Sequence, residues 1–103
     1  MEPETVERAS AAADTAASQA RVTARDAASL LARTAEVLER SAALAQEHAE
    51  RRERAGRIDS AAEERRVAWR AHEAAARARA KAEEWLELSE GRERELGPST
   101  RIG

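Results

Sequence analysis

The stretch ERRERAGRIDSAAEE, residues 50–64, interrupts an otherwise helical pattern and decides the fold. Its three early arginines favour a helix C-terminus, where cations complement the dipole, and Gly56 can adopt the left-handed conformation that ends a helix. Asp59 or Ser60 can cap a new helix, and the glutamate three residues after Ser60 gives the spacing of a capping box. We therefore expect a turn at residues 56–59 between two helices.

The residues before this turn, 3–55, predict a long first helix. Pro3 suits the first helical turn, where its missing N–H leaves no hydrogen bond unmade. At about 100° per residue, apolar and small side chains fall on one half of the cylinder and charged side chains on the other. The apolar stripe consists of Ala24, Ala27, Leu30, Leu31, Thr34, Ala35, Val37, Leu38, Ala42, Leu44, Ala45 and Ala49.

The residues after the turn predict a shorter second helix over 60–90 that ends before Gly91. Residues 91–103 contain three glycines and a proline, so we expect a flexible C-terminal tail. The stripe of the second helix consists of Val67, Ala71, Ala74, Ala75, Ala78, Ala82, Trp85 and Leu88.

A short connection makes two helices antiparallel neighbours, so the predicted fold is an all-α, coiled-coil-like antiparallel two-helix hairpin over residues 1–90. The large residues of the first helix then meet alanines of the second, which lets the axes approach the short end of the ~8–10 Å range. The expected neighbours are Trp85 with Leu30 and Leu31, Ala78 with Val37 and Leu38, and Ala71 with Leu44. The alternative is one unbroken helix in a parallel coiled coil, which would place four turns of charged residues in its seam.

The composition predicts a helical protein with a thin core. Alanine supplies 27 residues, whereas Leu, Ile and Val together number 13, and Phe and Tyr are absent. The hairpin has little large apolar surface to offset the entropy of ordering it, and residues 4–24 overhang the second helix. A second copy, or another helical protein, would supply the missing surface, most simply as a homodimeric four-helix bundle.

Several classes of protein are excluded or disfavoured by the sequence. It contains no cysteine, so it can form neither disulfides nor thiolate metal sites. No apolar run is long enough to span a membrane, and the N-terminus lacks the hydrophobic region of a signal peptide, so we expect a cytoplasmic protein. Seventeen arginines against one lysine, with abundant alanine, suit a GC-rich bacterial genome.

No constellation of residues predicts catalysis. His48 and His72 lack a third donor at metal-ligand spacing, and the glycines occupy the turn and the tail and not a phosphate-binding loop. We expect no enzymatic activity, no cofactor, no metal and no small-molecule ligand.

The sequence instead favours a structural or interaction protein that self-associates or docks on a helical partner. Trp69 falls on the far side of the second helix beside Ala76 and Ala80, and exposed tryptophans are common anchors of interfaces. The candidate partner-binding residues are Trp69, Leu30, Leu31, Val37, Leu38, Leu44 and Trp85.

Two alternatives remain at this point. The first is nucleic-acid binding through arginines clustered around the turn, although acidic residues share that region and no aromatic residues alternate with the arginines. The second is a chain that is disordered alone and folds on its target. The arginines of the first alternative are Arg51, Arg52, Arg54, Arg57, Arg65, Arg66 and Arg70.

Overall fold

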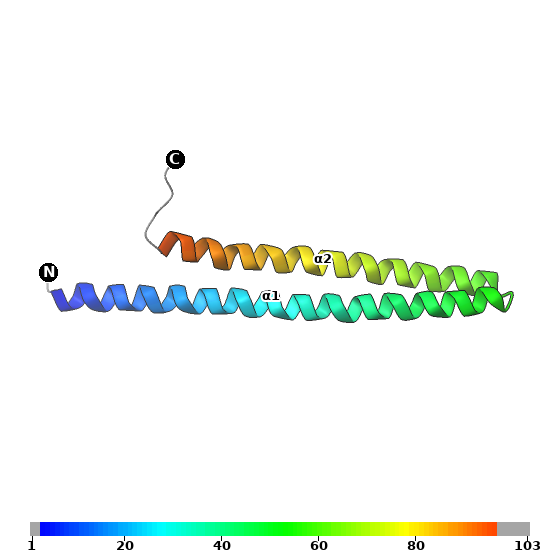
Figure 1. The fold of residues 1–103 in the computed structure, drawn as a ribbon. Coiled ribbons are helices and arrows are strands. Elements are labelled where there is room, and N and C mark those ends of the chain that lie inside the picture. Colours follow the sequence, from blue (N-terminus) through cyan, green and yellow to red (C-terminus); the bar gives the residue numbers. More distant parts are fainter. Residues whose placement is uncertain (1–2, 97–103) are drawn as a thin grey trace, which may run out of the picture.

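The computed structural model describes residues 3–96, which form two α-helices, α1 (Pro3–Arg54) and α2 (Ile58–Leu96). The helices lie side by side and antiparallel, joined by a tight turn, and α1 continues past the end of α2 at its N-terminal end (Figure 1). The long axis measures 81 Å. No strand occurs within residues 3–96, so the predicted all-α helical hairpin is confirmed.

The turn is built by a Schellman motif at the end of α1. The Arg57 N–H donates to the Arg52 carbonyl at 2.8 Å, and the Gly56 N–H donates to the Glu53 carbonyl at 3.0 Å. This pair of bonds requires a left-handed residue between them, and Gly56 supplies it with a φ of 79°. The predicted role of Gly56 in ending the first helix is therefore confirmed.

The second helix begins earlier than the sequence predicts, at Ile58. The Arg57 carbonyl accepts the first helical bond, from the Ala61 N–H at 3.0 Å, so Ser60 lies inside the helix and does not cap it. Because the Schellman motif has already reversed the chain, α2 needs no further residues before its first turn. Asp59 lies in that first turn, where its charge complements the helix dipole.

The second helix also ends later than predicted, at Leu96 instead of Glu90. Gly91 is helical and does not end it. A glycine inside a helix costs only about 1 kcal/mol relative to alanine, and the Arg, Glu and Leu residues of 92–96 have high helix propensity. The first six residues of the predicted flexible tail, 91–96, are thus helical, and 97–103 lie outside the described residues.

The two helices meet along a seam of alternating three- and four-residue spacing, the pattern of a heptad repeat. Every apolar residue that is fully buried among the described residues is an alanine. The central cluster contains Ala35, Ala75 and Ala78, with Leu31 and Leu38 packed against it. We label the seam positions a and d. The a positions are Ala28, Ala35, Ala42 and Ala49 in α1, and Ala61, Ala68, Ala75, Ala82 and Ser89 in α2. The d positions are Ala24, Leu31, Leu38, Ala45 and Arg52 in α1, and Glu64, Ala71, Ala78 and Trp85 in α2; an e position directly follows each d, and a g position directly precedes each a.

Five of the large residues predicted to lie in the seam lie outside it: Leu30, Val37 and Leu44 of α1, and Val67 and Leu88 of α2, which are 41 and 55% exposed. Leu30, Val37 and Leu44 are 60, 54 and 52% exposed, so the expected contacts of Val37 with Ala78 and of Leu44 with Ala71 are wrong. Each of these residues directly precedes a seam position and is therefore rotated by about 100° from it. An alanine-lined seam brings the helices close together and leaves room for one row of larger side chains, which Leu31 and Leu38 fill.

Candidate interaction surfaces

A flat pair of antiparallel helices has two broad faces, and in this hairpin they differ in chemistry. Positions e of both helices lie along one edge of the seam, and positions g lie along the other. The face on the e side, which we call the ion-paired face, carries most of the ion pairs that join the helices. The face on the g side, which we call the leucine face, carries Leu30, Val37 and Leu44 from α1 and Val67 and Leu88 from α2.

On the ion-paired face, side chains of α1 form ion pairs with side chains of α2 and so join the two helices. Arg79 Nη1 donates to Glu39 Oε1 at 3.2 Å, and His72 Nδ1 lies 3.1 Å from the same oxygen. Nearer the turn, Arg65 pairs with Glu53. These partners occupy e positions of the two helices, so the pairs fix which residues of α1 lie level with which residues of α2.

Charge on these glutamates is favoured by their partners. Partial burial raises the pKa of the Glu39 carboxyl, but hydrogen bonds from Arg79 and His72 outweigh this effect and hold the pKa below its ordinary value. Arg66 lowers the pKa of the Glu63 carboxyl through a hydrogen bond and through its charge. Both glutamates are therefore ionised at neutral pH and strengthen the polar contacts that they make.

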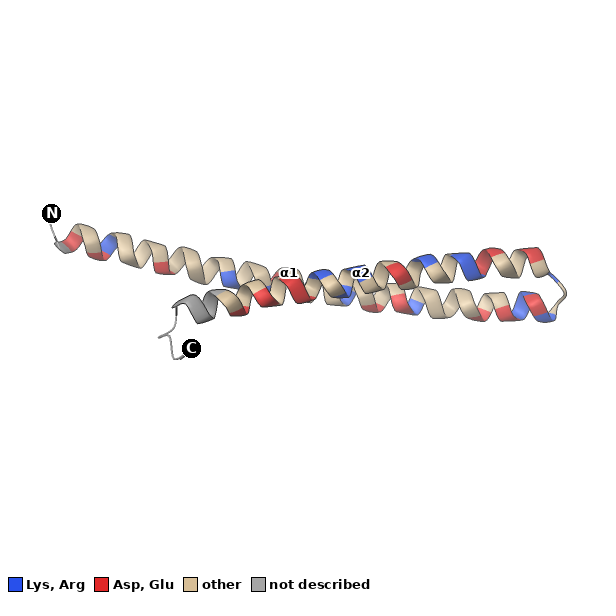
Figure 2. Cartoon of the chain, turned by 90° about the horizontal axis from the view of Figure 1, so that it is seen from above, with Lys and Arg blue, Asp and Glu red and all other residues tan. Residues whose placement is uncertain are grey.

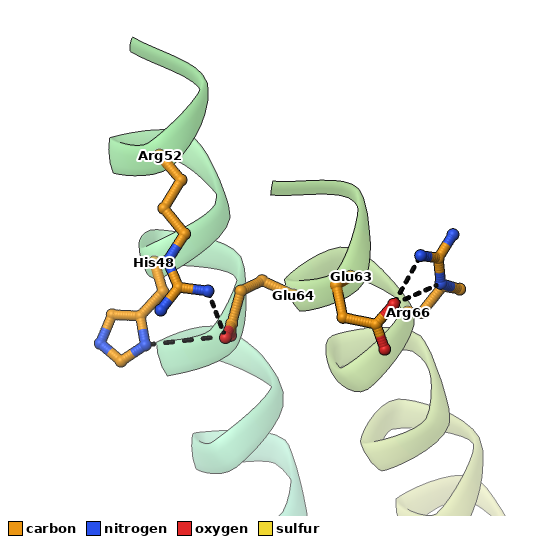
Figure 3. A network of polar contacts seen from close by, with 5 residues as sticks. All are labelled: His48, Arg52, Glu63, Glu64 and Arg66. Atoms are coloured by element: carbon orange, nitrogen blue, oxygen red, sulfur yellow. Dashed lines mark hydrogen bonds and ion pairs between the residues drawn. The ribbon is translucent and has the colours of Figure 1, made fainter. Parts of the chain in front are cut away.

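A polar layer closes the seam near the turn (Figure 3). Glu64 reaches from α2 toward α1, where Arg52 Nη1 donates to it at 2.8 Å and His48 Nδ1 lies 3.9 Å from it. Arg52 and Glu64 both occupy seam positions, and their side chains are only 37 and 22% exposed. A polar pair at such positions specifies the register of a coiled coil. The Glu63–Arg66 pair in the same view lies outside the seam, on α2 alone.

Trp69 projects from the ion-paired face and is 62% exposed. Its ring centroid lies 6.1 Å from that of His72. A hollow of about 470 Å³ beside it is floored by Ala42 and Ala68 and bordered by Ala43, and charged or polar side chains surround it. The indole therefore stands at the edge of a small apolar patch inside a polar surround, as interface anchors do.

The leucine face holds five of the ten exposed large hydrophobic side chains of residues 3–96. Leu30, Val37 and Leu44 recur every seven residues, so they form a straight row along α1. The g positions of α1 beside this row hold small residues, Ala27, Thr34 and Ser41. On α2, Val67 and Leu88 continue the apolar surface across the hairpin. Covering such side chains contributes about 1.5–3 kcal/mol for each one fully buried.

The arginines around the turn are interleaved with acidic residues (Figure 2). Three of the seven are ion-paired: Arg52 with Glu64, Arg65 with Glu53, and Arg66 with Glu63. These ion pairs neutralise positive charge on the arginines that would otherwise be available to bind nucleic-acid phosphates. The turn is therefore a mixed-charge surface.

The structure distributes the predicted partner-binding residues over three places. Leu31, Leu38 and the partly buried Trp85 lie in the seam, so contacts within the chain already cover them to a large extent. Leu30, Val37 and Leu44 form the row on the leucine face, and Trp69 stands on the opposite face. The sequence reasoning missed the Glu39–Arg79 and Glu53–Arg65 pairs. Acidic residues fourteen apart on α1, matched by arginines fourteen apart on α2, were the signal that could have revealed them.

Within residues 3–96, no cluster of three or more His, Asp or Glu side chains could hold a metal ion. In the same part of the chain, neither helix has a long enough apolar segment to cross a membrane. Comparison of the chain with family models, with curated proteins and with solved structures gave no match.

Proposed function

We propose that this chain is a non-enzymatic interaction protein that binds another helical surface, its own or that of another protein, through the apolar side chains left outside its seam. The proposal rests on which side chains are buried and which are exposed: alanines fill the seam, while Leu30, Val37 and Leu44 are exposed in a row. A helix row of this kind, with small residues between larger ones, is what helix-on-helix packing uses. Trp69 offers a second, smaller anchor on the opposite face.

The alternative, nucleic-acid binding through the arginines at the turn, has less support because glutamates of the hairpin already pair with three of them. A phosphate-binding surface would give an affinity that falls steeply with salt. We expect no shift of single- or double-stranded nucleic acid at low salt. A salt-sensitive shift that is lost in Arg51→Ala/Arg54→Ala/Arg57→Ala would contradict our proposal.

Site-specific photo-crosslinking in the cells that naturally produce the chain tests the proposed function. A photoreactive amino acid at Val37 or at Trp69 should capture a partner, either a second copy or another protein identified by mass spectrometry. The control carries the same group at Glu7, an exposed residue in the overhang of α1. Capture at Val37 and Trp69 that does not exceed capture at Glu7 would show that neither surface docks a partner.

A further inference from the structure

We infer that the leucine face is covered by a second copy of this chain, rotated about an axis parallel to the helices so that α1 of each copy lies over α2 of the other. Both turns then point the same way, and all neighbouring helices are antiparallel. This inference rests on the proposed function and names its partner and geometry.

The dimension of the face suits a dimer. Between residues 27 and 48 the row on α1 runs about 30 Å, and two adjacent helices are about 20 Å wide, which gives a projected area of about 600 Å². A standard interface takes about 800 Å² of accessible surface from each partner. That is about a tenth of the 7918 Å² exposed by the hairpin. Standard interfaces range from about 600 to 1,000 Å² per partner, so the leucine face reaches the lower end of that range.

Charge along the outer edge of the face selects this arrangement. The register of the hairpin places Ala42 of α1 level with Ala71 of α2, and two residues away, Arg40 level with Glu73. In the proposed dimer, residues that are level with each other within one hairpin are also level between the two copies. The row of α1 that points away from the seam, which we call the outer row, therefore faces the outer row of α2 of the second copy. Opposite charges then meet in three successive layers, Arg40 with Glu73, Glu47 with Arg66, and Arg54 with Asp59, against one layer of like charges, Asp26 with Glu87.

The main rival arrangement stacks α1 on α1 of the second copy, with the turns at opposite ends. Matching all three apolar layers sets Val37 against Val37 and Leu30 against Leu44. The same outer row then places Arg33 against Arg40 and Asp26 against Glu47, like charges in both cases. Because like charges across a helix interface are destabilising, this register is disfavoured.

The ion-paired face is a less favourable binding surface for a second copy. Its cross-helix pairs with Glu39 and Glu53 are already satisfied within the chain. Covering them would remove water from charged groups without a new partner for each, which is unfavourable. The leucine face carries no such cross-helix pair between its g positions among the described residues. Small or apolar side chains occupy most of these g positions, and the charged residues Arg70, Arg77 and Glu84 of α2 lie at the edge of the face.

Sedimentation equilibrium over the micromolar range tests the dimer itself. The expected result is a dimer whose dissociation constant rises about 100-fold or more in Leu30→Glu/Val37→Glu. Leu86→Glu, on the ion-paired face, is the matched control and should leave the constant unchanged. Both sites are exposed in the single hairpin, so circular dichroism should show helices in each variant. A wild-type monomer throughout, or equal effects of the two changes, would overturn the inference, while crosslinking of Val37 to another protein would still support the proposed function.

A charge exchange and a distance measurement test the arrangement. Arg40→Glu should weaken the dimer about 10-fold, and adding Glu73→Arg should restore it. The chain has no cysteine, so Arg57→Cys carries a single spin label at the turn. Labels in the proposed dimer lie within about 20 Å, the width of two packed helices. In the rival arrangement they lie about 60 Å apart, because each turn is about 30 Å from Val37. A distance near the longer value would overturn the proposed geometry.

Discussion

Glu39 of α1 and Arg79 of α2 stand forty positions apart in the chain, yet Arg79 Nη1 donates a hydrogen bond to Glu39 Oε1 at 3.2 Å. The same carboxylate lies 3.1 Å from His72 Nδ1, so one residue of α1 binds two residues of α2. Because the two partners on α2 are one heptad apart, the contact holds α2 against sliding along α1. It also makes the hairpin sensitive to the charge of Glu39.

The first prediction concerns stability in acid. The folded-state pKa of Glu39 lies below the ordinary value of a glutamate, so its ionisation stabilises the hairpin at higher pH, and this contribution is lost as the pH falls from the ordinary value through the folded one. Glu39→Gln should therefore destabilise the hairpin near pH 6 and should flatten the decline of the melting temperature in acid. Thermal melts followed by circular dichroism between pH 6 and pH 3 measure both effects.

Glu36→Gln is the matched control, because Glu36 is exposed on the same helix and no ion pair between it and α2 exists within the described residues. It should reproduce the wild-type pH profile more closely than Glu39→Gln does. Identical profiles for the two variants would show that the Glu39–Arg79 contact contributes nothing in solution.

The second prediction concerns the alanine seam. Ala75 is fully buried against Ala35 and Ala78, so Ala75→Leu should overpack the seam and lower the free energy of unfolding by about 1–3 kcal/mol. Ala80→Leu makes the same chemical change at an exposed position of the same helix, and both residues are strong helix formers. Urea denaturation should separate the two variants. Equal stability would mean that the helices are not in close contact at Ala75.

The third prediction contrasts two glycines that one substitution affects in opposite directions. Gly56 has a φ of 79°, a conformation that costs an L-residue about 1–2 kcal/mol, so Gly56→Ala should destabilise the hairpin by that amount. Gly91 is helical, so Gly91→Ala should stabilise it by about 0.5–1 kcal/mol. An added Cβ meets no atom within 4 Å at either site, so conformation alone sets the sign. Chemical denaturation of both variants checks the prediction, and a shared sign would contradict it.

The fold was predictable because its determinants are local. Gly56 and the arginines before it identify the turn from sequence alone, and the helix propensity of the flanking residues predicts two rods. The start of α2 was less predictable. Ser60 has the spacing of a capping box, which predicts that the helix begins there. A Schellman motif, however, needs only Arg57 after the glycine, and the hydrogen bonds of the structure show that α2 begins directly after Arg57.

The composition of the faces was harder to predict because it depends on how closely the helices pack. On a straight helix, Leu44 and Ala45 both fall on the apolar half, and hydrophobicity alone favours burial of the leucine. In the structure Ala45 is buried and Leu44 is exposed. The strict alternation of three- and four-residue steps along both helices is the sequence signal for this outcome, since it fits Ala45 and excludes Leu44.

The last prediction uses two adjacent leucines to test that assignment. Leu31 packs on the alanine cluster of the seam, so Leu31→Ala should lower the free energy of unfolding by about 2 kcal/mol at any protein concentration. Leu30 is 60% exposed, so in a dilute, monomeric sample Leu30→Ala should change it by less than about 0.5 kcal/mol. The substitution is identical and the positions are neighbours, so helix propensity cancels in the comparison. At higher concentration the effect of Leu30→Ala should grow if a second copy covers the leucine face, whereas that of Leu31→Ala should not. Urea denaturation at two concentrations measures all four values, and a larger loss for Leu30 than for Leu31 in the dilute sample would place the wrong leucine in the seam.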